Sequence, residues 1–109
     1  MSHVTTHVLD TARGRPAAGV VVVLEQAVGD PPILATATTD VDGRVVELGP
    51  GRLEAGVYRL RFNTGGYFAE HAVPSLYPEI VVSIEVREVE HYHVPLLLSP
   101  FGYSTYRGS

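Results

Sequence analysis

The sequence contains no cysteine and no lysine, and each absence excludes a class of function. Without cysteine there can be no disulfide, no thiolate zinc site and no cysteine nucleophile. All eight basic side chains other than histidine are arginines, against twelve acidic residues, which gives a net charge of −4. No basic patch is present to neutralise phosphates, so nucleic acid is not an expected partner.

Long apolar runs and targeting signals are absent as well. No apolar stretch approaches the ~18 residues that a membrane-spanning helix needs. Residues 1–7 lack the basic region and apolar stretch of a secretory signal, and the ending Arg107-Gly108-Ser109 is not a peroxisomal tripeptide. We therefore expect a cytoplasmic protein with no membrane partner, and the lack of cysteine fits a reducing compartment.

A chain of 109 residues is long enough for one compact domain, expected to span residues 1–109. Such a chain buries roughly 60–70% of its unfolded surface, which supports one hydrophobic core. A deep catalytic cleft is hard to form in so small a monomer. If the protein is an enzyme, its pocket is expected between subunits.

Most apolar residues alternate with polar ones, which is typical of β-strands. Alternating faces are clear in residues 79–87 and 58–62, and further strands are expected around His7 and in residues 33–39. Residues 19–25 contain four valines and a leucine, as in a strand that is covered on both faces. The pattern predicts an all-β, two-sheet sandwich of about eight strands.

Turn residues separate these strands, and one segment breaks their pattern. Asp40-Val41-Asp42-Gly43 predicts a tight turn in which Gly43 takes a positive φ. Residues 65–73 predict one short helix, which Pro74 and Pro78 would close. Pro95 cannot donate to a strand ladder, so its strand should be paired on only one side there.

The five histidines are the residues best suited to chemistry. His91 and His93 lie two apart on a predicted strand and therefore share a face, as His3 and His7 do on the first strand. If these strands are neighbours, the imidazoles converge. A His-X-His pair can hold zinc, but no third ligand stands at motif spacing, so only adventitious zinc on His91 and His93 is left open. His71, like His3, is expected to be solvated or structurally hydrogen-bonded.

The C-terminus allows two interpretations. The β-prone residues 103–106 are followed by Arg107-Gly108-Ser109, which could be a frayed tail. Alternatively, the last strand is held in a sheet and delivers Arg107 and the terminal carboxylate to a fixed place. The residue pattern alone does not choose between them.

Several stretches resemble the transthyretin-related family. They are Thr6-His7-Val8-Leu9-Asp10-Thr11, Thr39-Asp40-Val41-Asp42-Gly43-Arg44, the segment 91–100 and the terminal Tyr103-Ser104-Thr105-Tyr106-Arg107-Gly108-Ser109. The ending Tyr-Arg-Gly-Ser resembles the hydrolase branch of that family. Transthyretin itself has lysine in place of His7, threonine in place of His93, and no Arg-Gly-Ser ending.

This resemblance implies a transthyretin-like (prealbumin-like) sandwich that assembles as a homotetramer, a dimer of dimers. The implied reaction opens the ring of 5-hydroxyisourate, giving 2-oxo-4-hydroxy-4-carboxy-5-ureidoimidazoline in urate degradation. No cofactor and no metal are expected.

The resemblance also implies the site. His7, Arg44, His93 and Ser109 are expected to be catalytic, and Tyr106 and Arg107 are expected to bind the substrate together with His7 and Arg44. The two histidines would flank the attacking water, with one as general base, and the sequence does not decide which. Arg44 would bind substrate oxygens through its planar fork. His91 is expected to be peripheral, and Asp10 structural.

Two other functions remain open. A carrier of the transthyretin type would bind a small aromatic ligand without turnover in the channel between the two dimers, although such a channel does not require His7 or His93. A domain that serves only in adhesion or assembly would be a monomer, indifferent to removal of residues 106–109.

Overall fold

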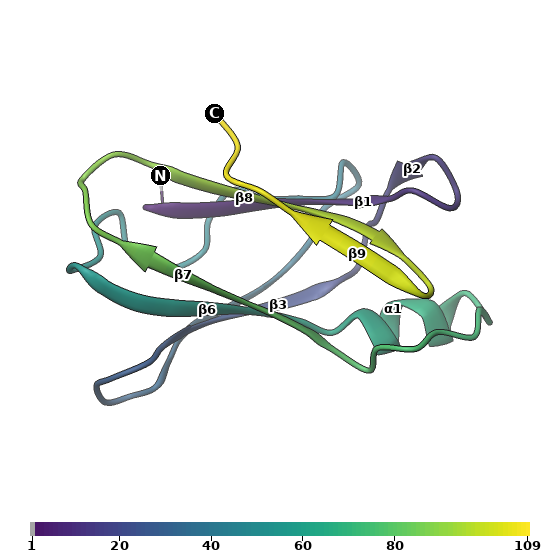
Figure 1. Ribbon diagram of the computed structural model, residues 1–109, viewed down its shortest axis with the longest axis horizontal. Coiled ribbons are helices and arrows are strands. Elements are labelled where there is room, and N and C mark those ends of the chain that lie inside the picture. Colours follow the sequence, from purple (N-terminus) through teal and green to yellow (C-terminus); the bar gives the residue numbers. More distant parts are fainter. Residues whose placement is uncertain (1) are drawn as a thin grey trace.

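The computed structural model describes residues 2–109 and consists of two β-sheets packed face to face, with one short helix at one end (Figure 1). The first sheet contains β1 (Val4–Asp10), β2 (Arg15–Pro16), β5 (Arg44–Val45), β8 (Tyr92–Ser99) and β9 (Gly102–Thr105). The second contains β3 (Val21–Gln26), β4 (Ile33–Thr38), β6 (Gly56–Phe62) and β7 (Ile80–Val86), and the helix is α1 (Thr64–Glu70). The predicted sandwich is confirmed. The described residues form nine strands, in line with the expected count of about eight, and two of them, β2 and β5, are only two residues long.

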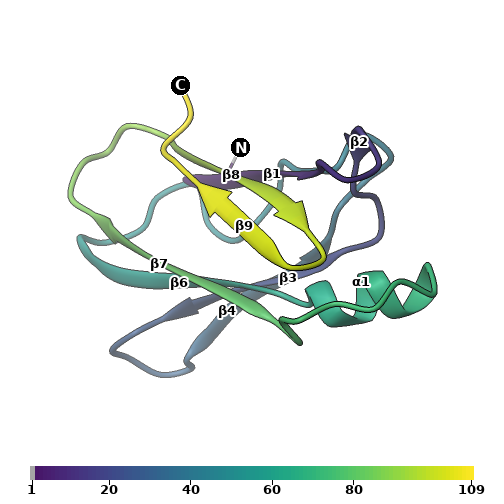
Figure 2. The same ribbon diagram turned by 45° about the vertical axis from the view of Figure 1, so that its right-hand side comes forward.

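The pairing of β1 with β8 determines where the candidate site residues lie. The first sheet has the order β2-β1-β8-β9, with β5 also paired to β1, and the second has the order β4-β3-β6-β7. β1 and β8 run parallel, so residues from the two ends of the chain lie side by side (Figure 2). β8 pairs with β9 only from Leu96 onward, so Pro95 is laddered on the β1 side alone, as its missing N–H predicts.

The core lies between the sheets and confirms most of the predicted alternation. Val8, Leu60, Phe62 and Leu96 are fully buried, and most of the residues that alternate with them along their strands are only partly buried. Burying a side chain of this size contributes about 1.5–3 kcal/mol. The prediction for residues 19–25 is wrong in part: β3 is buried on one face only, and Val21 is exposed on the other. A run of valines does not distinguish a doubly covered strand from one whose outer face is free.

The predicted turn and helix both form. Gly43 has φ +74°, and its N–H donates to the Asp40 carbonyl at 2.9 Å. The Asp40 carboxylate accepts from the backbone N–H of Asp42 and of Arg44, at 2.9 Å each, so the turn leads directly into β5. In α1, the Asn63 side chain caps the helix by accepting from the Gly66 N–H. Within residues 2–109 no helix is long and apolar enough to cross a membrane.

Candidate active site

The strand registers bring the predicted site residues to one face of the first sheet. His7 lies directly opposite Arg44 in the β1–β5 pair, and Thr5 lies opposite His93 in the β1–β8 pair. Directly opposed residues project to the same side of a sheet. The neighbouring residues Val8 and Val94 point into the core, so these polar side chains lie on the outer face. His7, Arg44 and His93, which are up to 86 positions apart in the sequence, are therefore neighbours in space.

A shallow pocket of about 240 Å³ opens on this face. Its walls come from β1, β5, β8 and the C-terminal tail, and His7 lies beside it, across from Arg44. The lining residues are Thr5, Thr6, Arg44, Val45, Val46, His91, His93 and Ser109.

His93 has one nitrogen held by the protein and one free. Its Nδ1 lies 2.8 Å from the Thr5 hydroxyl, and no hydrogen bond within residues 2–109 involves its Nε2. No buried side-chain nitrogen in that range lacks a partner, so Nε2 is open to solvent. Partial burial lowers the pKa of His93, and the nearby Arg44, His91 and His7 lower it further. The imidazole is therefore neutral at pH 7, with a lone pair available to accept a proton.

His7 and Arg44 complete the polar face in different ways. The Nε2 of His7 lies 2.8 Å from the Asp42 carbonyl, which can only accept, so this nitrogen carries a proton and the ring is fixed. Arg44 forms no ion pair within the described chain. Its guanidinium is available for oxygen atoms of a ligand.

The C-terminal tail is anchored to β8, which excludes the frayed-tail interpretation. The Gly108 N–H donates to the His93 carbonyl at 2.8 Å, and the Thr105 hydroxyl donates to the Pro95 carbonyl at 2.7 Å. A Cβ at Gly108 would lie 2.7 Å from Cδ2 of His93, so only glycine allows the tail to pass this close to the imidazole. The tail thereby places Ser109 at the pocket.

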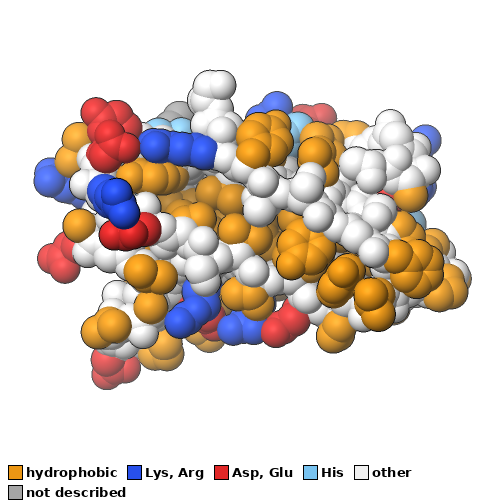
Figure 3. Space-filling view, in the orientation of Figure 1, with side chains coloured by type: hydrophobic (Ala, Val, Ile, Leu, Met, Phe, Trp, Pro, Cys, Tyr) orange, Lys and Arg blue, Asp and Glu red, His pale blue; other side chains and the backbone are white. Residues whose placement is uncertain are grey.

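The structure does not bring Tyr106 and Arg107 to this pocket within one chain. Both line a separate groove of about 510 Å³ at the open edge between the sheets, where apolar side chains are visible in Figure 3. The Arg107 guanidinium stacks on the Tyr92 ring at 4.1 Å and lies 3.3 Å from the Glu88 carboxylate. The observed contacts of Arg107 anchor the tail, and the expected contact of Tyr106 and Arg107 with the substrate stays a prediction.

Thr5 and His91 are among the pocket residues that the sequence does not predict for the site. Thr5 contacts both His93 and His91, and the two imidazoles are stacked with centroids 6.3 Å apart. His91, expected to be peripheral, lines the pocket. Strand parity would have identified Thr5 if the parallel β1–β8 register had been known.

His3 and Asp10 have structural roles, as expected. Nδ1 of His3 accepts from the Leu53 N–H at 2.8 Å, and its Nε2 faces two backbone carbonyls. The buried Asp10 carboxylate accepts from the Tyr67 hydroxyl and the Arg13 N–H. Burial and this Asp10 contact raise the pKa of Tyr67.

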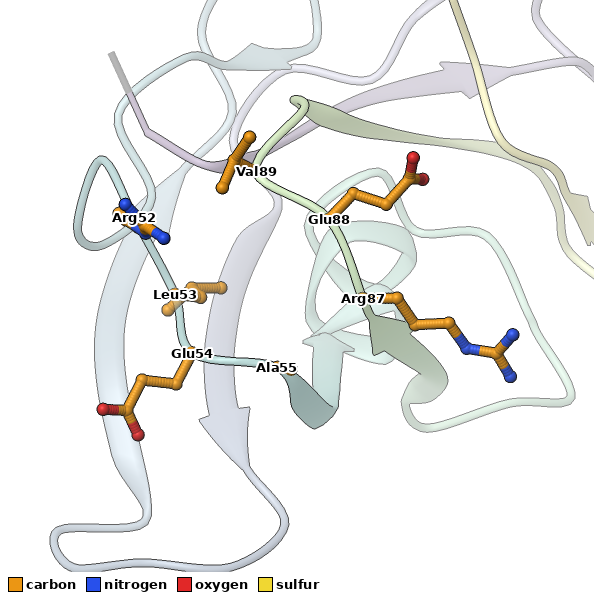
Figure 4. Close-up of a pocket in the computed structure, with 7 residues that line it drawn as sticks. All are labelled: Arg52, Leu53, Glu54, Ala55, Arg87, Glu88 and Val89. Carbon is orange, nitrogen blue, oxygen red and sulfur yellow. The ribbon is translucent and has the colours of Figure 1, made fainter.

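A larger hollow, of about 580 Å³, lies between the loops 52–55 and 87–89 (Figure 4). It contains no histidine, and the charged ends of Glu54, Arg87 and Glu88 point in different directions. It offers no paired acid and base. No group of three or more histidine, aspartate or glutamate side chains within residues 2–109 is arranged to hold a metal ion.

The molecule is thus a transthyretin-type sandwich whose first sheet has imidazoles and a guanidinium on its outer face. Residues 4–108 match the model of the HIUase/Transthyretin family, and the chain belongs to this family.

Both 5-hydroxyisourate hydrolases and a transthyretin are similar to this chain. The 5-hydroxyisourate hydrolase of Halalkalibacterium halodurans is 50% identical, over 97% of this chain and 97% of its own length. The solved structure of the Klebsiella pneumoniae 5-hydroxyisourate hydrolase is 37% identical, with a TM-score of 0.89, over 100% of this chain and 94% of that one. Sea bream transthyretin in complex with thyroxine is 30% identical, also with a TM-score of 0.89, over 96% of this chain and 93% of that one.

Proposed function

We propose that this chain hydrolyses 5-hydroxyisourate to 2-oxo-4-hydroxy-4-carboxy-5-ureidoimidazoline, a step of urate degradation. The supporting observation is that an imidazole with a lowered pKa, a guanidinium and Ser109 of the tail meet in one pocket. The relatives named as 5-hydroxyisourate hydrolases, which match nearly the whole chain, support the same substrate.

His93 is the general base in this proposal. Water attacks C6 of the N1–C6 amide while Nε2 of His93 takes one of its protons. Nε2 is the nitrogen that has no protein partner within residues 2–109, and the lowered pKa keeps it unprotonated at pH 7. A positioned base of this kind contributes on the order of 10²–10⁴-fold in rate.

Arg44 stabilises the oxygen of C6 as it becomes negatively charged. A donor in this position contributes on the order of 10²–10³-fold. When the C6–N1 bond breaks, the proton that His93 took is delivered to N1, which restores the neutral imidazole and leaves a carboxylic acid that loses its remaining proton to solvent. His7, whose ring the Asp42 carbonyl orients, binds the substrate beside Arg44. No step in this scheme requires a metal or a cofactor.

The tail contributes through Ser109, whose hydroxyl orients the water or the substrate at the pocket wall. In this proposal Arg107 acts mainly by holding the tail through Tyr92 and Glu88, and Tyr106 stays an expected substrate contact. Direct contact of either residue with the substrate would require a neighbouring copy of the chain.

We also propose that the chain works as a homotetramer, a dimer of dimers. Ligand sites usually bury 70–90% of a small ligand, whereas the pocket of one chain is shallow and open on one side. A second copy facing this sheet would close it. Light scattering should give four times the chain mass of 11.8 kDa, and a monomer would contradict the assembly.

A carrier function is the second candidate, because sea bream transthyretin, solved with thyroxine, has the same fold. A carrier would bind an aromatic ligand without accelerating any reaction. The polar, partly buried His93 favours the hydrolase over this alternative. A cytoplasmic location remains a prediction, for which cell fractionation is the test.

The direct test is the ultraviolet decay of freshly prepared 5-hydroxyisourate with and without the protein. We expect acceleration well above the spontaneous rate, and its loss in His7→Ala, Arg44→Ala and His93→Ala. No acceleration by the wild-type chain would discard the function. Near wild-type rates in all three variants would discard the site.

A further inference from the structure

The Thr5 hydroxyl joins two imidazoles on the outer face of the first sheet. Thr5 Oγ1 lies 2.8 Å from Nδ1 of His93 and 2.9 Å from Nε2 of His91, both within hydrogen-bond distance. Thr5 is buried, and its place opposite His93 in the parallel register fixes this arrangement. The hydrogen bonds therefore run from His91 through Thr5 to Nδ1 of His93, the ring nitrogen other than the proposed base Nε2.

A hydroxyl has one proton to donate and two lone pairs to accept, so its direction determines the state of its neighbours. If Thr5 donates to His93, Nδ1 must be bare and Nε2 must carry the proton, which leaves no base at the pocket. If Thr5 donates to His91 instead, it accepts from the Nδ1–H of His93, and Nε2 keeps its lone pair. Only the second direction gives a competent base.

We propose that Thr5 and His91 are positioning residues that hold His93 as the Nδ1–H tautomer, with Nε2 as the lone-pair nitrogen at the pocket. His91 provides the acceptor that draws the Thr5 proton away from His93. The inference rests on the proposed function, since it assigns the state of the same base. Neither residue needs to touch the substrate to act in this way.

The packing around His93 helps to keep these hydrogen bonds in place. Gly108 lies against the ring on the side of Cδ2, where even an added Cβ would come within 2.7 Å, so the tail restricts movement of the imidazole on that side. When His93 takes a proton from water, the imidazolium donates Nδ1–H to Thr5, which remains directed to His91. The hydrogen bonds therefore suit the imidazole both before and after proton transfer, and no side chain has to move during the reaction.

The first test reads the tautomer without any substrate. In the assembled protein labelled with ¹⁵N-imidazole histidine, above pH 8, we expect His93 to show a protonated Nδ1 and a bare Nε2, with resonances assigned from His93→Gln. A wild-type His93 with the proton on Nε2 would overturn the proposal, whatever the activity of the protein. Failure of the proposed function would instead appear as absent hydrolysis and would leave this spectrum unchanged.

The second test separates positioning from folding. We expect Thr5→Val, which keeps the shape of the side chain, to lower kcat on the order of 10- to 100-fold with little change in KM, because the base loses its tautomer and orientation. Thr5→Ser restores the hydroxyl and should recover most of the rate. His91→Phe keeps a stacked ring without an acceptor, and it should lower kcat and shift His93 toward Nε2–H.

Thr64→Val is the matched control, because it removes another buried threonine hydroxyl, one that donates to Tyr77 far from the pocket. It should leave kcat and the His93 spectrum unchanged. If Thr5→Val loses no more activity than Thr64→Val, or if Thr5→Ser is as impaired as Thr5→Val, the proposal is wrong. If Thr5→Val fails to fold, the wild-type spectrum and His91→Phe still decide.

Discussion

The outer faces of the two sheets differ in the side chains that surround Arg61 and Arg44. On the second sheet, Arg61 lies 3.1 Å from Glu25 and 2.7 Å from Glu79, so its charge is matched within the face. On the first sheet, Arg44 has no carboxylate partner among the described residues and lies beside imidazoles instead. A surface ion pair adds little to the stability of the fold, whereas an unpaired guanidinium is free to bind a ligand. Arg59 on the second sheet also has no ion pair among the described residues, so the first face is distinguished by imidazoles beside its unpaired guanidinium, which is where we propose the site.

The largest effect should come from His93. Replacing it with glutamine keeps a polar side chain of similar size but removes the base, so kcat should fall on the order of 10²–10⁴-fold. The decay of 5-hydroxyisourate measures the rate, and circular dichroism checks the fold. A folded variant with the wild-type rate would assign the proton transfer to another group.

Arg44→Gln should reduce the rate nearly as much, on the order of 10²–10³-fold, because the developing negative charge loses its donor. It also removes a positive charge that lowers the pKa of His93, so this pKa should rise toward its ordinary value. The acid limb of the residual activity should therefore move to higher pH. An unchanged midpoint would show that the charge of Arg44 does not affect the pKa of His93, and it would contradict the proposed difference between the two faces.

Gly108→Ala tests the tail as part of the first face. Its Cβ would lie 2.7 Å from His93 and 3.2 Å from Pro95, so either the ring or the tail must shift. A shift of about 1 Å can cost on the order of 10²-fold in rate. Gly102→Ala is the control, since the nearest atom to its Cβ is 3.7 Å away. Equal activities of the two variants would show that the tail does not set the position of the imidazole.

The smallest effect is expected on the second sheet. Arg61→Ala breaks an exposed ion pair with Glu79 and a partly buried one with Glu25, and both contribute little because water and salt screen surface charges. Activity should stay within error of the wild type, and thermal melting should change only slightly. A large loss of activity would mean that the second face takes part in the function.

The sequence predicted the parts of the site that depend on local patterns. Strand parity placed His93 opposite to the core-facing Tyr92 and Val94, and the Asp-Gly turn before Arg44 formed as expected. The helix was found because residues 65–73 break the strand period, although it already ends at Glu70. These features follow from neighbouring residues, where periodicity and turn preferences act directly.

The parts that depend on distant pairing could not be predicted. Thr5 and His93 are 88 residues apart, and no local signal gives the parallel register that brings them together. The path of the tail is equally hidden, since no local signal predicts that Arg107 stacks on Tyr92. The exposed side of β3 was misjudged because a valine run has no period from which a free face can be recognised.

The pH dependence of kcat/KM for the wild-type protein tests the central claim most directly. Protonation removes the base, and burial together with neighbouring positive charge lowers the pKa of His93 below the ordinary value of about 6.5. The rate should therefore be constant near neutral pH and fall tenfold per unit only at pH values below about 6.5. A rate that is independent of pH down to 4, or one that falls already above 6.5, would contradict His93 as the neutral base.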